Sequence, residues 1–220
     1  MTSGPDGPST VDLTRIRLHA ILDVDAAARA AWATLDLASA FLDGGAPWIQ
    51  VRAKDLASGR FLDLCEAVVD LAKPYGATVV VNDRVDFVRL SGAAGVHVGQ
   101  DDLSLSGARR LLGPDAIVGY STHTVDQIDH AVLQPVSYIA VGPVFGTLTK
   151  DTGYEAVGLG RVSEAVARAH GRPVVAIGGI TLERAPSVIA AGASAVAVIG
   201  DLLATGDPRT SVRAYLRTLS

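Results

Sequence analysis

The feature that most constrains the fold is a repeated alternation of short β-branched runs with longer segments rich in Ala and Leu. Strands that alternate with helices in this way are typical of parallel sheets. Eight such units in 220 residues leave about 27 residues per unit, close to the ~30 of a βαβ repeat. The alternation predicts an α/β fold with a single (β/α)8 barrel rather than an open doubly wound sheet. The expected strands begin near Arg17, Trp48, Thr78, Gly95, Ala116, Ser137, Pro173 and Ala195.

The eight units divide the chain into a tail and one domain. All eight units lie within residues 17–220, which we expect to form the barrel domain. Residues 1–16 are expected to be a disordered tail, because Met1–Thr10 is rich in Gly, Pro and Ser and lacks the basic start and apolar run of a signal peptide. Cys65 is the only cysteine, which excludes an intrachain disulfide and fits a reducing compartment. These features predict a cytoplasmic location.

Composition limits the classes of partner. Hydrophobic residues make up 49% of the chain and the mean hydropathy is +0.32, so a membrane span has to be considered. The two longest uncharged stretches, 131–149 and 185–200, are interrupted by prolines and by small or polar residues, and we interpret both as buried strands with loops. The net charge of −4 argues against nucleic acid and anionic membranes as partners. Any phosphate group must therefore be recognised locally.

Two segments outside the strands carry specific expectations. Phe61, Cys65 and Val68 fall at helical spacing on one face of the segment 61–72, so we expect Cys65 to be a core residue rather than a reactive thiol. The segment 147–158 is the longest irregular stretch after the tail and follows the sixth strand. A long loop at this place in a barrel is a candidate lid.

Cations at the end of the second strand give the first indication of a site. The active site of such a barrel is built at the carboxyl ends of its strands. Gln50, Arg52 and Lys54 share one face of an extended strand, because side chains alternate along it. Two converging cations need an anion, and a diphosphate would satisfy both. The alternative is a structural salt bridge, for which Asp55 is the obvious acidic neighbour.

Carboxylates follow the next two strands. Asp83 ends the third strand and Asp102 follows the fourth. Neighbouring parallel strands lie ~4.8 Å apart, so these carboxylates can share a hard cation such as Mg²⁺. An ordinary role in turns or helix caps is an equal alternative. Asp101 would point to the opposite face if the strand stayed extended, so we assign it no role.

Glycines end the last two strands. Gly178 and Gly179 follow the seventh strand, and Gly200 follows the eighth. Glycine lets the backbone N–H groups approach a phosphomonoester, and barrels commonly bind phosphate at this place. The alternative is that these glycines only make tight turns.

The histidines add little to this pattern. No spacing among them suggests a metal triad, and a satisfied structural role is expected for His19, His97, His130 and His170. His123 stays open, because it lies in the polar end of the fifth strand.

Six segments at six successive strand ends together resemble the thiamine-phosphate synthase family, whose members are phosphate-binding TIM barrels. The resemblance extends over about residues 17–201, in the same order and at compatible spacing. The segments are IQVRAK (49–54), VVVNDRVDF (79–87), GVHVGQDDL (95–103), GYSTHT (119–124), VGPVFGTLTK (141–150) and AIGGI (176–180).

The resemblance implies a transferase that joins two small molecules, a pyrimidine diphosphate and a thiazole ethyl phosphate, into thiamine phosphate and pyrophosphate. It implies one Mg²⁺ ion per site, held by Asp83 and Asp102. The positions that match the pyrimidine diphosphate site are Gln50, Arg52, Lys54, Asn82, Ser121 and Lys150, of which Arg52, Lys54, Ser121 and Lys150 would be catalytic. The positions that match the thiazole phosphate site are Thr147, Leu148, Thr149, Gly179, Ile199 and Gly200.

Two other functions remain as alternatives. One is a thiazole tautomerase-like isomerase with His123 as the proton carrier. The other is a non-catalytic protein that binds thiamine phosphate. Neither needs the pair Asp83 and Asp102, so we favour the synthase. Three positions depart from the family pattern, Ala53, Gly146 and Gly200, and the last removes a hydroxyl from the thiazole phosphate site.

Overall fold

A computed structural model describes residues 11–146 and 155–220. Eight parallel strands close into a barrel in sequence order, which confirms the predicted fold, and each expected strand start lies within one residue of the observed one. The strands are β1 (Leu18–Asp23), β2 (Trp48–Arg52), β3 (Thr78–Asn82), β4 (Gly95–Val98), β5 (Ile117–Thr122), β6 (Tyr138–Val141), β7 (Val174–Ile177) and β8 (Ala195–Val198).

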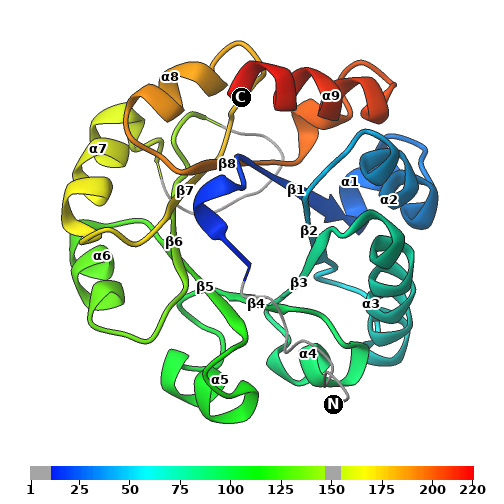
Figure 1. Cartoon of the computed structure of the whole chain (residues 1–220), viewed down its shortest axis with the longest axis horizontal. Coiled ribbons are helices and arrows are strands. Elements are labelled where there is room, and N and C mark those ends of the chain that lie inside the picture. The colour runs from blue at the N-terminus through cyan, green and yellow to red at the C-terminus, as the bar shows by residue number, and fades with distance from the viewer. Residues whose placement is uncertain (1–10, 147–154) are drawn as a thin grey trace, which may run out of the picture.

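Helices surround the barrel as an outer ring (Figure 1). The α-helices are α1 (Val24–Arg29), α2 (Thr34–Asp43), α3 (Ser58–Ala72), α4 (Val85–Ser91), α5 (Leu105–Leu112), α6 (Val125–Val132), α7 (Gly158–Arg168), α8 (Ala185–Ala190) and α9 (Pro208–Leu219). Short 3-10 helices are η1 (Leu13–Arg15), η2 (Lys73–Tyr75) and η3 (Gly200–Leu202). Among the described residues, no helix is long and apolar enough to cross a membrane.

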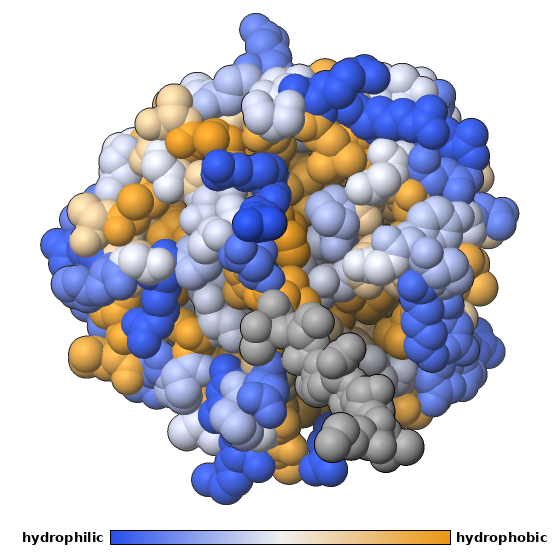
Figure 2. All heavy atoms as spheres, viewed as in Figure 1, coloured by the Kyte–Doolittle hydropathy of each residue, from blue (hydrophilic) through white to orange (hydrophobic). Residues whose placement is uncertain are grey.

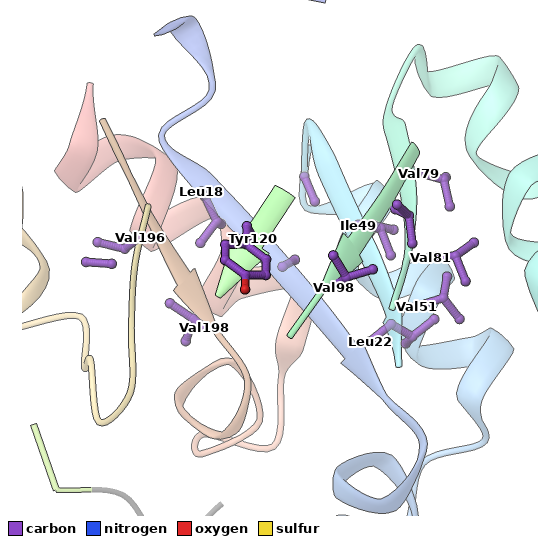
Figure 3. Close-up of a cluster of buried hydrophobic side chains, with 14 of the residues drawn as sticks. Leu18, Leu22, Ile49, Val51, Val79, Val81, Val98, Tyr120, Val196 and Val198 are labelled. Carbon is purple, nitrogen blue, oxygen red and sulfur yellow. The ribbon is translucent and has the colours of Figure 1, made fainter. Parts of the chain in front are cut away.

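The main core lies between the strands and the ring of helices. Alternate residues of each strand point outward into it, as Leu18 and Leu22 of β1 and Ile49 and Val51 of β2 do (Figure 3). Burying apolar area is the main stabilising contribution to a domain of this size. On the face shown in Figure 2, hydrophilic residues form much of the outline, while hydrophobic residues lie mainly between them.

The other residue of each alternating pair points into the barrel. Trp48 and Tyr138 are fully buried there, and His19 stacks on Trp48 with 4.1 Å between ring centroids. Burial lowers the pKa of His19 to about 3, with a smaller contribution from His97, so His19 is neutral. Gly119 makes room for the Tyr138 ring, since a Cβ on Gly119 would lie 2.1 Å from the Tyr138 Cζ atom. The interior is therefore packed below the strand ends.

The N-terminal boundary differs from the predicted tail over 1–16. Residues 13–15 form η1, over the centre of the barrel in Figure 1, and the Asp12 side chain accepts a hydrogen bond from the Thr14 N–H. Leu13 packs against the interior cluster, and Ile16 is buried within it. Residues 11–16 are folded because these apolar side chains cover the end of the barrel where the strands begin. Residues 1–10 lie outside the described part of the chain.

Cys65 is buried on the inner face of α3, as predicted. Burial raises the pKa of its thiol to about 12, with a smaller contribution from Glu66. A thiol with so high a pKa is not a nucleophile at neutral pH. Cys65 is a core residue.

Candidate active site

The carboxyl ends of the strands surround a cavity of about 740 Å³. All the predicted site residues that the structure describes line it: Gln50, Arg52, Lys54, Asn82, Asp83, Asp102, Ser121, Gly179, Ile199 and Gly200. The predicted residues Thr147, Leu148, Thr149 and Lys150 lie outside the described residues, as does most of the candidate lid over 147–158. In the lid segment only the last residues are described, and α7 begins at Gly158.

The two cations at and just after the end of β2, Arg52 and Lys54, are each paired with a carboxylate. Arg52 forms an ion pair with Asp23 at the end of β1, and the Lys54 Nζ atom donates to the Asp83 Oδ2 atom at 2.5 Å. Asp23 also caps α1, because its Oδ1 atom accepts a hydrogen bond from the Ala26 N–H at 2.8 Å. From the sequence, Asp55 was the expected acidic partner of these cations in the alternative of a structural salt bridge. Neighbouring strands supply the partners instead, because β1 and β3 flank β2.

Asp83 and Asp102 line the same part of the cavity, and the Asp102 carboxyl affects the pKa of Asp83. The pKa of the Asp83 carboxyl is raised, mainly by burial and also by the Asp102 carboxyl, although the hydrogen bond from Lys54 lowers it in part. The Asp83 backbone has φ +65, a left-handed conformation that Asp tolerates better than most residues. The Oδ2 atom of Asp102 accepts a hydrogen bond from the Gly99 N–H at 2.7 Å.

Two adjoining carboxylates suit Mg²⁺, which is usually held by one or two carboxylates together with substrate phosphates and water. The described residues contain no cluster of three or more His, Cys, Asp or Glu side chains that could hold a metal. A cation here would therefore depend on the substrate for its remaining ligands. Asp83 and Asp102 fit that arrangement.

Asp101 differs from its prediction, because it also lines the cavity. Strand β4 ends at Val98, and the residues after it turn rather than continue extended. The alternation of faces therefore stops before Asp101, and the condition for placing Asp101 on the opposite face, a strand that stays extended, is not met.

A buried polar network lies beneath Ser121. The two ring nitrogens of His97 lie 2.8 Å from the Ser121 Oγ atom and 2.9 Å from the Tyr138 hydroxyl. Tyr138 also shares a hydrogen bond with Gln50, and burial raises the pKa of the Tyr138 hydroxyl, so it is protonated. His97 is satisfied, as the sequence predicted, but its connection to Ser121 was not predicted. The one available signal was its place at an inward position of β4.

Two further polar residues hold the neighbouring strand end. The Gln100 Nε2 atom donates to the Ser121 carbonyl at 2.6 Å, and its Oε1 atom accepts from the Tyr120 hydroxyl at 3.0 Å. His123 also lines the cavity, where its Nδ1–H donates to the Gly142 carbonyl at 2.6 Å. These hydrogen bonds fix the backbone that carries Ser121.

Glycine backbone forms the opposite side. Gly178 and Gly179 have φ values of +100 and +62, which favour glycine. A Cβ on Gly179 would lie 2.4 Å from the Gly146 carbonyl oxygen, so glycine also lets the loops after β6 and β7 meet. Ile199 and Gly200 border the same side of the cavity at the start of η3.

Sequence reasoning missed two charged residues on this side, Arg184 and Asp201. Asp201 is held by two donors: its Oδ2 atom accepts hydrogen bonds from the Leu182 N–H at 2.9 Å and from the Tyr215 hydroxyl at 2.7 Å. Their positions shortly after the ends of β7 and β8 were the available signal.

A family model described as thiamine monophosphate synthase matches residues 20–202. The chain belongs to this family. A thiamine-phosphate synthase of Koribacter versatilis is 42% identical over 205 residues, which cover 92% of this chain and 95% of the relative. Another, of Roseiflexus castenholzii, is 42% identical over 82% of this chain and 78% of the relative.

Solved structures extend the comparison. The thiamine phosphate pyrophosphorylase of Pyrococcus furiosus superposes with a TM-score of 0.84 at 26% identity, over 94% of this chain and 96% of that one. A 3-hexulose-6-phosphate synthase, at 17% identity and a TM-score of 0.68, shares the fold alone. Membership of the thiamine monophosphate synthase family makes the chain an enzyme of the transferase class.

Proposed function

We propose that this enzyme is a thiamine-phosphate synthase, which joins a pyrimidine methyl diphosphate to a thiazole ethyl phosphate. The observation that carries the proposal is one cavity with paired carboxylates and cations on one side and glycine backbone on the other. A diphosphate and a phosphomonoester need two such different surroundings. The relatives named thiamine-phosphate synthase support the same reaction.

The pyrimidine diphosphate would occupy the side formed by β2 to β5. Arg52 and Lys54 would bind its phosphate oxygens, and Gln50, Asn82 and Ser121 would supply neutral hydrogen bonds. Lys54 would have to exchange part of its contact with Asp83 for a contact with substrate. The Arg52–Asp23 pair keeps the guanidinium in place before substrate arrives.

Asp83 and Asp102 would hold one Mg²⁺ ion, whose positive charge would stabilise the negative charge that develops on the departing pyrophosphate. The effect of Asp102 on the pKa of Asp83 supports this assignment, because a shared cation would relieve the repulsion between two ionised carboxylates.

The reaction is a substitution at the exocyclic methylene carbon of the pyrimidine. The C–O bond breaks first, its electron pair leaves with pyrophosphate, and the aminopyrimidine donates electrons to the resulting cation. The thiazole nitrogen then forms the C–N bond with its lone pair. Arg52 and Lys54, with Lys150, would stabilise the leaving group, and Ser121 would donate a hydrogen bond to it. No nucleophilic side chain is required.

The thiazole phosphate would bind on the side formed by β7 and β8. Gly179, Ile199 and Gly200 would present backbone N–H groups to the phosphate. Thr147, Leu148 and Thr149 would complete this site, as the family resemblance implies. Holding both substrates in line supplies the remaining rate acceleration.

The test is formation of thiamine phosphate from both substrates, detected after oxidation to its fluorescent derivative, with Mg²⁺ and again with a chelator. Product that depends on the metal supports the synthase. A folded protein that forms no product but isomerises the thiazole phosphate would be the tautomerase-like isomerase. A folded protein that binds thiamine phosphate without turnover would be the binding protein. Product formed equally with chelator would remove Mg²⁺ from the proposal.

The proposal also includes partners and location. The partners are small molecules, without nucleic acid or membrane, which the net charge of −4 supports. The single cysteine supports a cytoplasmic location.

A further inference from the structure

Arg184 lines the cavity but has no role in the proposed binding of either substrate. It directly precedes α8, and it lines the cavity together with Gly179 and Gly200. The guanidinium is anchored in two ways: its Nη1 atom donates to the Gly179 carbonyl at 3.0 Å, and its Cζ atom lies 4.9 Å from the centroid of the Phe145 ring. The positive charge is therefore held between the loops after β6 and β7.

Arg184 differs from the other described Lys and Arg residues of the cavity in its charge balance. Arg52 is paired with Asp23, and Lys54 with Asp83. Within residues 11–146 and 155–220, Arg184 has no carboxylate within salt-bridge distance. The Asp201 carboxylate, which also lines the cavity, is bound by the Tyr215 hydroxyl and the Leu182 N–H. Arg184 has remaining donors for an anion.

The location of Arg184 selects which anion. In an eight-stranded barrel closed in sequence order, β7 lies opposite β3. Arg184 follows β7, whereas Asp83 follows β3. Gly200, which also lines the cavity, offers a phosphate its backbone but no side-chain donor. An anion bound by the glycines would meet the guanidinium of Arg184.

We propose that Arg184 binds the phosphate group of the second substrate and determines the preference of this site for a phosphorylated thiazole. The inference rests on the proposed function. An arginine can give two parallel N–H bonds to one phosphate, so Arg184 supplies the charge that glycine N–H groups lack. One N–H group keeps the contact with the Gly179 carbonyl, so the guanidinium and the glycine loop bind the phosphate together.

The experiment measures equilibrium binding of the thiazole phosphate and of the corresponding thiazole alcohol, in the presence of Mg²⁺ and pyrophosphate, and then the KM for each substrate. Arg184→Gln should weaken binding of the thiazole phosphate about tenfold and raise its KM similarly. Affinity for the alcohol and the KM for the pyrimidine diphosphate should each change by less than about twofold. Arg184→Lys should retain part of the preference for phosphate.

Arg60→Gln is the matched control, because Arg60 is an exposed arginine on α3 outside the cavity lining. It should change none of these values. An unchanged affinity of Arg184→Gln for the thiazole phosphate would overturn the inference. So would an equal loss for phosphate and alcohol, since that would mean Arg184 acts only by supporting the Gly179 loop.

Failure of the proposed function gives a different result. A wild-type protein that binds the thiazole phosphate without forming thiamine phosphate would contradict the synthase, and the ratio of phosphate to alcohol binding would still decide the role of Arg184. A wild-type protein that binds the two compounds equally would overturn the inference directly. If Arg184→Gln does not fold, the same comparison with Arg184→Lys decides it. A folded lysine variant with a reduced preference for the phosphate would support the inference. A folded lysine variant whose affinities for phosphate and alcohol are unchanged, or fall by the same factor, would overturn it.

Discussion

The two sides of the cavity recognise charge by different means. On the side of β2 to β4, side chains dominate, with Arg52 paired to Asp23 and Lys54 paired to Asp83 across neighbouring strands. On the side of β7 and β8, glycine backbone dominates, with Gly178 and Gly179 at positive φ. On the first side, both cations already have a carboxylate partner before substrate binds. The second is shaped by the backbone, and we infer that it has one anchored cation, Arg184.

The two sides of the cavity should differ in their sensitivity to substitution. A side built from paired charges depends on which charge is removed, because the partner is left unbalanced. A side built from glycine depends on space and backbone conformation, because any Cβ changes both. The predictions below test this contrast, beginning with the largest expected effect.

Asp83→Asn should lower the Mg²⁺-dependent rate at least about a hundredfold, because it removes one of two carboxylates proposed to hold the metal. Asparagine keeps the shape of the side chain and tolerates the left-handed backbone, so the thermal midpoint should stay close to that of the wild type. Rates measured over a range of Mg²⁺ concentrations check this. Asp63→Asn, on the exposed face of α3, is the control. A variant with normal rate and metal dependence would contradict the ligand assignment.

Gly179→Ala should destabilise the protein by about 1–3 kcal/mol, because alanine is strained at φ +62 and its Cβ would meet the Gly146 carbonyl. The displaced backbone should also raise the KM for the thiazole phosphate more than the KM for the diphosphate. Urea unfolding and steady-state kinetics measure the two effects. Gly160→Ala is the control, because Gly160 lies in α7 with no atom within 4 Å of its would-be Cβ. Equal changes in both KM values would contradict the proposal that the two substrates bind on different sides of the cavity.

Lys54→Ala should reduce kcat/KM about tenfold, through weaker binding of the diphosphate or weaker stabilisation of the leaving group. The effect is smaller than that of Asp83→Asn because Arg52 stays in place. Lys73→Ala removes a lysine from an exposed surface pair and should have no effect. An unchanged kcat/KM in Lys54→Ala would remove Lys54 from the site.

His19→Phe should change the pH dependence of stability and leave the stack on Trp48 in place. Burial holds the pKa of His19 at about 3 in the folded protein, against 6.5 as its ordinary value. Between these values the unfolded chain binds one proton more than the folded one, so the free energy of unfolding falls as pH falls. In the variant this slope should decrease by about one proton.

Urea unfolding at several pH values from 6.5 down to 4 measures the slope for His19→Phe and for the wild type. His130→Phe, at an exposed position on α6, is the control for the same substitution outside the barrel interior. Equal slopes in His19→Phe and the wild type would show that His19 is not the group that titrates on unfolding.

Prediction from sequence succeeded where a signal is local and periodic. The expected starts of β2 and β3, at Trp48 and Thr78, coincide with the observed ones, because buried β-branched runs bounded by polar residues mark a parallel strand. Gln50, predicted from the alternation, and Asn82 and Ser121, implied by the family resemblance, line one cavity. The alternation of faces does not extend to Asp101, because β4 ends at Val98.

Contacts between strands could not be predicted in the same way. Asp23 lies 29 residues before Arg52, and nothing in the sequence marks them as an ion pair. The link from His97 to Ser121 likewise joins two strands. Arg184 and Asp201 were missed because each is an ordinary charged residue just beyond a glycine turn.

The number of strands, their order and the residue types at their carboxyl ends follow from the sequence, because hydrophobic periodicity and turn chemistry act over a few neighbouring residues. The tertiary structure alone decided which charges pair, such as Lys54 with Asp83 rather than with Asp55. It also decided which backbone must be glycine, since the space beside Gly179 is taken by the loop after β6. Pairing and space depend on strands that are distant in sequence, and barrel closure alone brings these strands together.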